Sequence, residues 1–146
     1  MKIVLLVAGG RGGSDFFQGL LDGHKEILSF PGYLRIDNNF VKLFEQSSYI
    51  DIAKKFINLY PHFFNSKNNF FERHNRLGKN KNKFFFVDKK IFLNNFVSLC
   101  GQPDLRKNPD KFELLKNLHI AYAQTVEGKI NKKKNLGIFS YHILWK

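Results

Sequence analysis

The chain has 146 residues, of which 43% are hydrophobic and 25% charged, a balance that excludes a disordered protein and suits one globular domain. Its formal net charge of +12 raises nucleic acid or an anionic membrane as partners. The single cysteine, Cys100, excludes an internal disulfide and a cysteine-based zinc site, and favours a reducing compartment.

The chain is predicted to open with a strand, a glycine-rich turn and a helix. Residues 3–7 (IVLLV) form a continuous apolar run, which is typical of a central strand buried on both faces of a parallel sheet. From Ser14 to Asp22 the apolar residues recur at helical spacing. The run over residues 1–8 is too short to cross a bilayer and lacks the features of a signal peptide, so we expect a cytoplasmic protein.

The next segments are predicted to be mostly helical. A short strand is expected at residues 26–30, and helices over residues 41–46 and 52–60. Asp51 is a suitable N-cap for the second of these helices, and Pro61 is suited to end it.

Residues 66–83, rich in Asn and Lys, are predicted to form a loop with a helical turn or two. The densest lysine runs, 79–83 (KNKNK) and 129–134 (KINKKK), lack the regular aromatic interleaving of a platform for single-stranded nucleic acid. We interpret them mainly as solvated loops, with an anion-binding face as the alternative. No nucleic acid and no membrane are therefore expected as partners.

Two later helices have recognisable start and stop signals. Asp88 is predicted to cap a helix that ends at Gly101. Asn108 and Pro109 are predicted to start the next helix, in the favoured order of cap then proline, and Gly128 to end it. The apolar stripe of this helix is predicted to consist of Phe112, Leu115, His119, Tyr122 and Val126.

The last predicted element is a second buried strand over residues 136–144 (LGIFSYHIL). Two strands at the ends of a chain, with mostly helices between them, make a poor complete sheet. We therefore expect residues 1–146 to form a single, truncated α/β domain with a parallel sheet and flanking helices.

The residues with the clearest chemistry lie at positions 9–24 (GGRGGSDFFQGLLDGH). Glycines let backbone N–H groups approach an anion, and the following helix presents its positive N-terminal end. Arg11 adds a planar cation and Ser14 a hydroxyl donor. The sequence therefore predicts an oxyanion site at this turn.

Two commoner phosphate motifs fit this segment less well. The loop that binds ATP and GTP requires a lysine followed by Ser or Thr, and the segment contains no lysine. The dinucleotide fingerprint would place Asp15, a carboxylate, where its third glycine belongs.

The segment resembles the 5′-phosphosulfate loop of the sulfotransferase family, whose usual form is a strand, Gly-Arg-Ser-Gly-Ser/Thr-Thr and a helix with Leu-Leu-x-x-His-Pro. The matching residues are Gly10, Arg11, Gly13, Ser14, Phe17, Leu20, Leu21, Asp22, Gly23 and His24, followed by Glu26, Ile27 and Leu28. The sequence departs from the family at Gly12, Asp15 and Lys25, where Ser, Thr and Pro are usual. We expect Asp15 to pair with Arg11 or to accept from the helix N–H groups.

The resemblance implies a P-loop-like fold, 3′-phosphoadenosine 5′-phosphosulfate (PAPS) as cofactor, and sulfuryl transfer to a hydroxyl or amine of a small-molecule or carbohydrate acceptor. It implies a cofactor site made of Gly10, Arg11, Gly12, Gly13, Ser14, Asp15 and Phe16. Arg11 would hold the phosphosulfate, which backbone N–H groups would surround. The alternatives are a noncatalytic nucleotide- or anion-binding module and, less favoured, a basic nucleic-acid-binding protein.

The family's second signature, a strand followed by Arg-Asp-Pro-Arg and a serine that bind the 3′-phosphate, has no match here, so whether this chain alone is an enzyme stays open. His24, Glu26 and Asp37 are candidates for a general base, but none is assigned. No metal site is expected, and Cys100 is interpreted as a small core residue.

Overall fold

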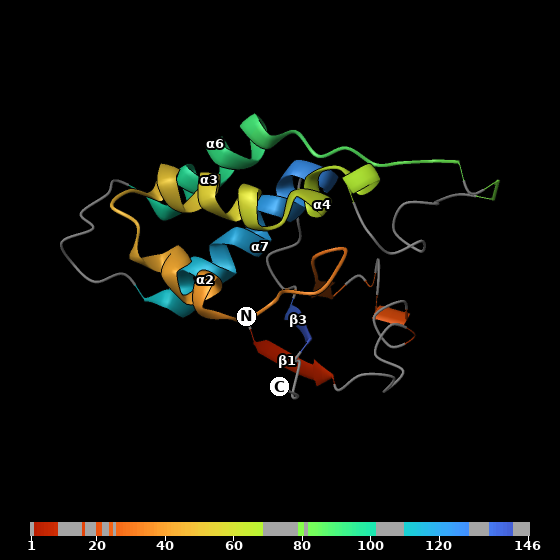
Figure 1. The fold of residues 1–146 in the computed structure, drawn as a ribbon, viewed down its shortest axis with the longest axis horizontal. Coiled ribbons are helices and arrows are strands. Elements are labelled where there is room, and N and C mark those ends of the chain that lie inside the picture. The colour runs from red at the N-terminus through yellow and green to blue at the C-terminus, as the bar shows by residue number, and fades with distance from the viewer. Residues whose placement is uncertain are drawn as a thin grey trace.

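The computed structural model describes residues 2–8, 16, 20–21, 24, 26–68, 79–80, 82–101, 110–128 and 135–141. In this part of the chain a small parallel sheet lies below a larger group of helices (Figure 1). The architecture is therefore α/β, as predicted.

The described sheet has three strands, β1 (Ile3–Ala8), β2 (Ile27–Leu28) and β3 (Asn135–Tyr141), in the order β1-β3-β2. Both pairings are parallel, and the register sets Ile3 beside Leu136 and Ala8 beside Tyr141. The parallel first strand and the short second strand are thus confirmed. The predicted central position of residues 3–7 is wrong, because β3 occupies the middle of the described sheet.

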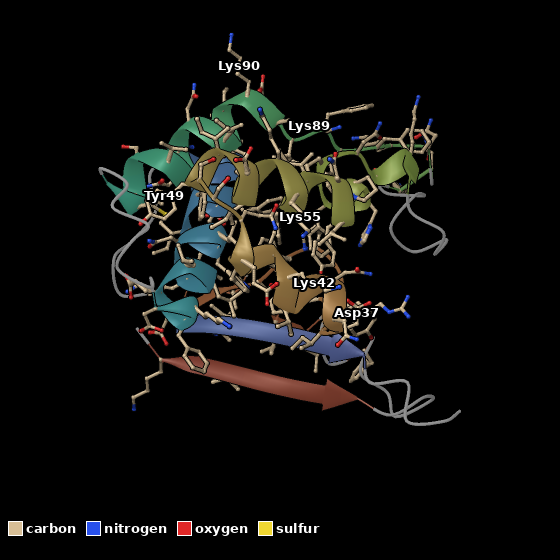
Figure 2. All side chains as sticks on the ribbon, turned by 60° about the vertical axis from the view of Figure 1, so that its left-hand side comes forward. Asp37, Lys42, Tyr49, Lys55, Lys89 and Lys90 are labelled. Atoms are coloured by element: carbon tan, nitrogen blue, oxygen red, sulfur yellow. The ribbon has the colours of Figure 1, made fainter. Side chains whose placement is uncertain are left out.

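β1 lies on the far side of β3 from the helices in both views (Figures 1 and 2). The side chain of Val4 is accordingly 61% exposed, so the predicted burial of this strand on both faces is wrong at this position. A continuous apolar run indicates a strand, but it does not fix which strand covers its edge.

Three long helices form the main body: α3 (Tyr49–Leu59), α6 (Lys89–Cys100) and α7 (Lys111–Glu127). α6 packs against both α3 and α7, and α7 also contacts β2. α7 lies between the strands and the other two helices (Figure 2). It therefore joins the helices to the sheet.

Short helical segments connect these elements: α2 (Asn38–Val41), the 3-10 helix η1 (Lys42–Glu45), α4 (Pro61–Phe64) and the 3-10 helix η2 (Ser66–Asn68). α2 and η1 together confirm the predicted helical segment 41–46, and η2 confirms a helical turn at the start of the predicted loop 66–83. Residues 69–78 and 81 of that loop lie outside the described residues.

The core contains an aromatic cluster contributed by α3, α4 and α6, and Tyr122 of α7 packs against it. Its fully buried phenylalanines are Phe56, Phe63, Phe64, Phe92 and Phe96. Rings such as Phe56 and Phe92, whose centroids lie 5.8 Å apart, pack in geometries that favour aromatic pairs. The high phenylalanine content of the sequence thus supplies the contact between the helices.

The helix boundaries confirm several of the predicted signals. The side chain of Asp88 accepts hydrogen bonds from the N–H groups of Lys90 and Ile91, so it is the N-cap of α6. Gly101 and Gly128 follow α6 and α7 with φ of 73° and 76°, the left-handed region that glycine tolerates.

Two predicted starts are wrong by two or three residues. Ser48, rather than Asp51, is the N-cap of α3, and its Oγ accepts the N–H of Asp51 at 3.1 Å. Asp110, rather than Asn108, caps α7, so the helix begins at Lys111. Pro61 opens α4 directly after α3 ends, which agrees with the preference of proline for the first turn.

The predicted apolar stripe of α7 is confirmed in its middle and wrong at its ends. Leu115, His119 and Tyr122 are buried, whereas Phe112 and Val126 are 68% and 57% exposed. Both exposed residues belong to the terminal turns of the helix. Periodicity predicts the face that points inward, but not how far along the helix its neighbours reach.

The last predicted strand is confirmed from residue 136 to residue 141. Residues 142–144 of that prediction lie outside the described residues, as do Asn108, Pro109 and the lysines of segment 129–134.

Candidate functional site

The predicted anion-binding loop connects β1 to a helical segment. β1 ends at Ala8, and Phe16 is helical, as are Leu20 and Leu21. Six of the seven predicted cofactor-binding residues, Gly10, Arg11, Gly12, Gly13, Ser14 and Asp15, lie outside the described residues. The seventh, Phe16, has a side chain that is 72% exposed.

The parallel sheet places the carboxyl ends of two strands side by side at this loop. Ala8, the last residue of β1, pairs with Tyr141, the last residue of β3. In parallel α/β sheets, ligands bind in the crevice outside the carboxyl ends of the strands. The end of β1 at Ala8 therefore lies at the edge of the sheet where ligands usually bind.

The candidate bases His24 and Glu26 take part in local structure. Nδ1 of His24 accepts the backbone N–H of Glu26 at 3.2 Å, and the carbonyl of His24 accepts the N–H of Ile27 at 3.1 Å. His24 thus shapes the turn that leads into β2. The side chain of Glu26 is exposed.

The third candidate base, Asp37, is the N-cap of α2. Its Oδ1 accepts the N–H groups of Asn39 and Phe40 at 2.9 and 3.1 Å. Its Oδ2 lies 3.2 Å from Nε of Arg35, whose side chain is largely exposed. The carboxylate is therefore engaged by a helix end and a guanidinium, which is the usual state of a structural cap.

Tyr60 lies beside this ion pair, and His62 lies next to Tyr60; neither was identified from the sequence as a site residue. The hydroxyl of Tyr60 donates to the carbonyl of Arg35 at 3.0 Å. Burial, with a smaller contribution from the charge of Asp37, raises the pKa of the Tyr60 phenol. Burial also lowers the pKa of His62, whose ring lies edge-on to Tyr60 at 6.2 Å. No spacing in the sequence links residues 35–37 to residues 60–62. The contact between Tyr60 and Arg35 joins residues 25 positions apart and depends on how α3 packs against the segment before it.

His119 is a deeply buried titratable group, with 2% exposure. Its Nδ1 lies 2.8 Å from the carbonyl oxygen of Leu115, so this nitrogen carries the proton and donates. Nε2 has no hydrogen-bond partner. Burial lowers the pKa of His119 to about 4, and the ring is therefore neutral near pH 7.

Cys100 lies at the end of α6, partly buried against the core. Burial raises the pKa of its thiol to about 11, although Nδ2 of Asn117 at 3.7 Å acts in the opposite direction. The thiolate, which is the nucleophilic form, is disfavoured at neutral pH.

A basic and aromatic surface precedes α6. Lys67, Lys83, Phe84 and Phe86 are all exposed, and Nζ of Lys67 lies 4.9 Å from the centroid of the Phe84 ring. The signal that would have found this surface is the run of three phenylalanines that directly follows the lysine-rich segment 79–83. This run does not match the usual pattern of a single-strand binding platform, because the aromatic residues follow the lysines instead of alternating with them.

Among the described residues no three His, Cys, Asp or Glu side chains form a group that would hold a metal ion. None of the helices in the described ranges is long and apolar enough to span a membrane. In comparison with known proteins, the chain matches no family model, no curated protein and no solved structure.

Proposed function

We propose that this chain binds PAPS through the loop of residues 10–16 and is a sulfotransferase that transfers a sulfuryl group to a hydroxyl or amine of a small-molecule or carbohydrate acceptor. The observation that carries the proposal is what flanks this segment of the sequence. Before it lies a parallel strand, β1, and after it, separated from β1 by seven residues, comes helical Phe16. A strand, a short glycine-rich turn and a helix are the elements that a phosphosulfate site requires.

The order of the strands supports a P-loop-like sheet over a dinucleotide-binding one. Both common doubly wound orders place the first strand next to the second. In the described sheet, β3 lies between β1 and β2. A dinucleotide site of the usual kind is therefore disfavoured by topology as well as by Asp15.

The residues of the loop have complementary roles in this proposal. The guanidinium of Arg11 binds the 5′-phosphosulfate and stabilises charge that develops on the bridging oxygen. The hydroxyl of Ser14 and the backbone N–H groups of residues 12–16 donate to the remaining oxygens. Asp15 pairs with Arg11 or accepts from the helix N–H groups, which keeps its charge away from the ligand. PAPS itself supplies the sulfuryl group.

A noncatalytic module that binds the 5′-phosphate group alone is the second candidate function. It is favoured by one observation: Nδ1 of His24 and the carboxylate of Asp37 are both used in local backbone hydrogen bonds. A side chain that holds a turn or a helix end is poorly placed to take a proton from an acceptor.

Calorimetry and a transfer assay distinguish the two functions. We expect adenosine 3′,5′-bisphosphate to bind the wild-type chain and to bind Arg11→Ala more weakly. Transfer of labelled sulfate from PAPS to a hydroxyl or amine would identify the enzyme, whereas binding without transfer would identify the module. If the folded wild-type chain bound neither PAPS nor the bisphosphate, both functions would be rejected.

A further inference from the structure

The segment that leads into α6 presents two phenylalanines to solvent. Phe84 and Phe86 are 41% and 65% exposed, whereas Phe85 packs against the core and Val87 is buried. Alternation of this kind is typical of an extended segment, and it places Phe84 and Phe86 on the same side. Both figures show this segment on the helical side of the molecule, away from β1 and β3.

Backbone hydrogen bonds fix the two exposed rings in place. The N–H of Ser66 donates to the carbonyl of Phe85 at 3.1 Å, and the N–H of Phe85 donates to Oγ of Ser66 at 3.0 Å. The N–H of Val87 donates to the carbonyl of Phe64 at 2.8 Å. Because the side chain of Ser66 is fully buried, this attachment belongs to the core. The exposed rings are therefore held outward.

Exposed lysines accompany these rings. Nζ of Lys67 lies over the face of the Phe84 ring, and Lys83 directly precedes Phe84 in the chain. The side chain of Lys79, four residues before Lys83, is also exposed. The described residues between 65 and 87 include no acidic side chain. Asp88, two residues after Phe86, is committed to capping α6. A ligand at this surface would meet aromatic faces and cations together.

We propose that Phe84 and Phe86, with Lys67, Lys79 and Lys83, bind single-stranded nucleic acid. Bases stack on aromatic side chains without regard to sequence, and lysines beside the rings neutralise the phosphates. Two residues apart on an extended segment, the rings are spaced by about 6.6 Å, so that each can hold one base. A lipid surface is disfavoured because apolar side chains that insert into membranes are usually presented by an amphipathic helix, which this segment is not.

This activity is independent of the proposed PAPS site. The nucleic-acid surface lies beside η2 and α6, whereas the anion-binding loop follows β1 at the sheet. Each function can therefore fail without the other.

The test uses the full chain and a fluorescent oligothymidylate of about 12 nucleotides, within the range that such surfaces cover. We expect fluorescence anisotropy to show binding. The logarithm of the association constant should fall with the logarithm of salt concentration with a slope of about −2, since three lysines contribute about 0.7 each. The double variant Phe84→Leu, Phe86→Leu keeps apolar bulk but removes both ring faces. Its affinity should fall about tenfold or more, the scale of a lost stacked base.

Phe112→Leu is the matched control, because Phe112 is also strongly exposed and also follows a lysine, Lys111. It should bind the oligonucleotide like the wild type. All three proteins should show the same denaturation midpoint, since the replaced side chains lie at the surface. Excess adenosine 3′,5′-bisphosphate should leave oligonucleotide binding unchanged.

Three kinds of result would overturn the proposal. The first is a double variant that binds as tightly as the wild type, or a control that is weakened as much as the double variant. The second is displacement of the oligonucleotide by the bisphosphate, which would assign it to the loop after β1. The third is binding to phosphatidylserine vesicles, unchanged in the double variant, with no binding to the oligonucleotide.

Discussion

The imidazole of His119 packs against the ring of Phe30, with 4.0 Å between the ring centroids. This contact joins the middle of α7 to the segment that follows β2, and so joins the helices to the sheet. The imidazole donates from Nδ1 to the carbonyl of Leu115 and leaves Nε2 bare. A proton added at Nε2 would place an unpaired charge in the core, which is costly.

The first prediction is that His119 makes the chain less stable in mild acid. Its pKa falls from 6.5 to about 4 on folding, so the unfolded state takes up the proton first as the pH drops. Above the pKa of His119 in the unfolded state, no unfolding free energy is lost. The loss grows as the pH falls from about 6.5 towards 4. At pH 5 it should amount to about 2 kcal/mol.

Urea denaturation near pH 7.5 and near pH 5 measures this loss, with His119→Phe as the comparison. The variant keeps a ring against Phe30 but cannot titrate there, so its stability should change less between the two conditions. Some dependence should persist, because burial also lowers the pKa of His62. Equal losses in wild type and variant would contradict the assignment to His119.

The second prediction concerns the buried hydroxyl of Tyr122, which donates to the carbonyl of Phe63 at 2.5 Å. Tyr122→Phe removes the donor and leaves a buried carbonyl without this bond, which should cost about 1 to 3 kcal/mol of unfolding free energy. Tyr60→Phe is a matched control, because its partner, the carbonyl of Arg35, belongs to an exposed residue and not to the core. A smaller loss is expected there, and a larger loss than in Tyr122→Phe would count against the role of the buried bond.

The third prediction distinguishes the cap expected from the sequence from the cap that the structure shows. Ser48→Ala removes the oxygen that accepts the N–H of Asp51, and should cost about 1 kcal/mol. Asp51→Asn keeps a polar group that can still accept from Oγ of Ser48, and should cost less. Thermal denaturation of the two variants measures the difference. The reverse order would restore Asp51 as the cap.

The sequence predicts helix ends correctly where they depend only on neighbouring residues. Asp88, Gly101 and Gly128 were predicted because a cap or a left-handed residue depends on the few residues around it. Ser48 was missed because the helical periodicity was read from Ile52, one turn too late. A capping serine followed three residues later by a carboxylate is the pattern that would have located it.

Nonlocal relationships could not be read from the sequence. The placement of β3 between β1 and β2 depends on pairing between the two ends of the chain, which no single segment specifies. The contact of Tyr60 with Arg35, and the attachment of Phe85 to Ser66, likewise join segments that carry no common motif. The candidate anion site was predicted because its glycines, arginine and serine are adjacent in the sequence.

The last prediction concerns the anion site and the phosphate group for which the chain has no matched motif. Arg11→Ala should lose about 1.5 to 3 kcal/mol of affinity for adenosine 5′-phosphate, the scale of a charge-assisted hydrogen bond. Lys81→Ala removes the same charge from a lysine-rich segment of the sequence and should change little. Because no Arg-Asp-Pro-Arg signature is present for the 3′-phosphate, adenosine 3′,5′-bisphosphate should bind scarcely better than the monophosphate. Calorimetry with both ligands measures the difference. A strong preference for the bisphosphate would show that a second phosphate site exists, and the lysines and arginines that hold it could then be sought by substituting them one at a time.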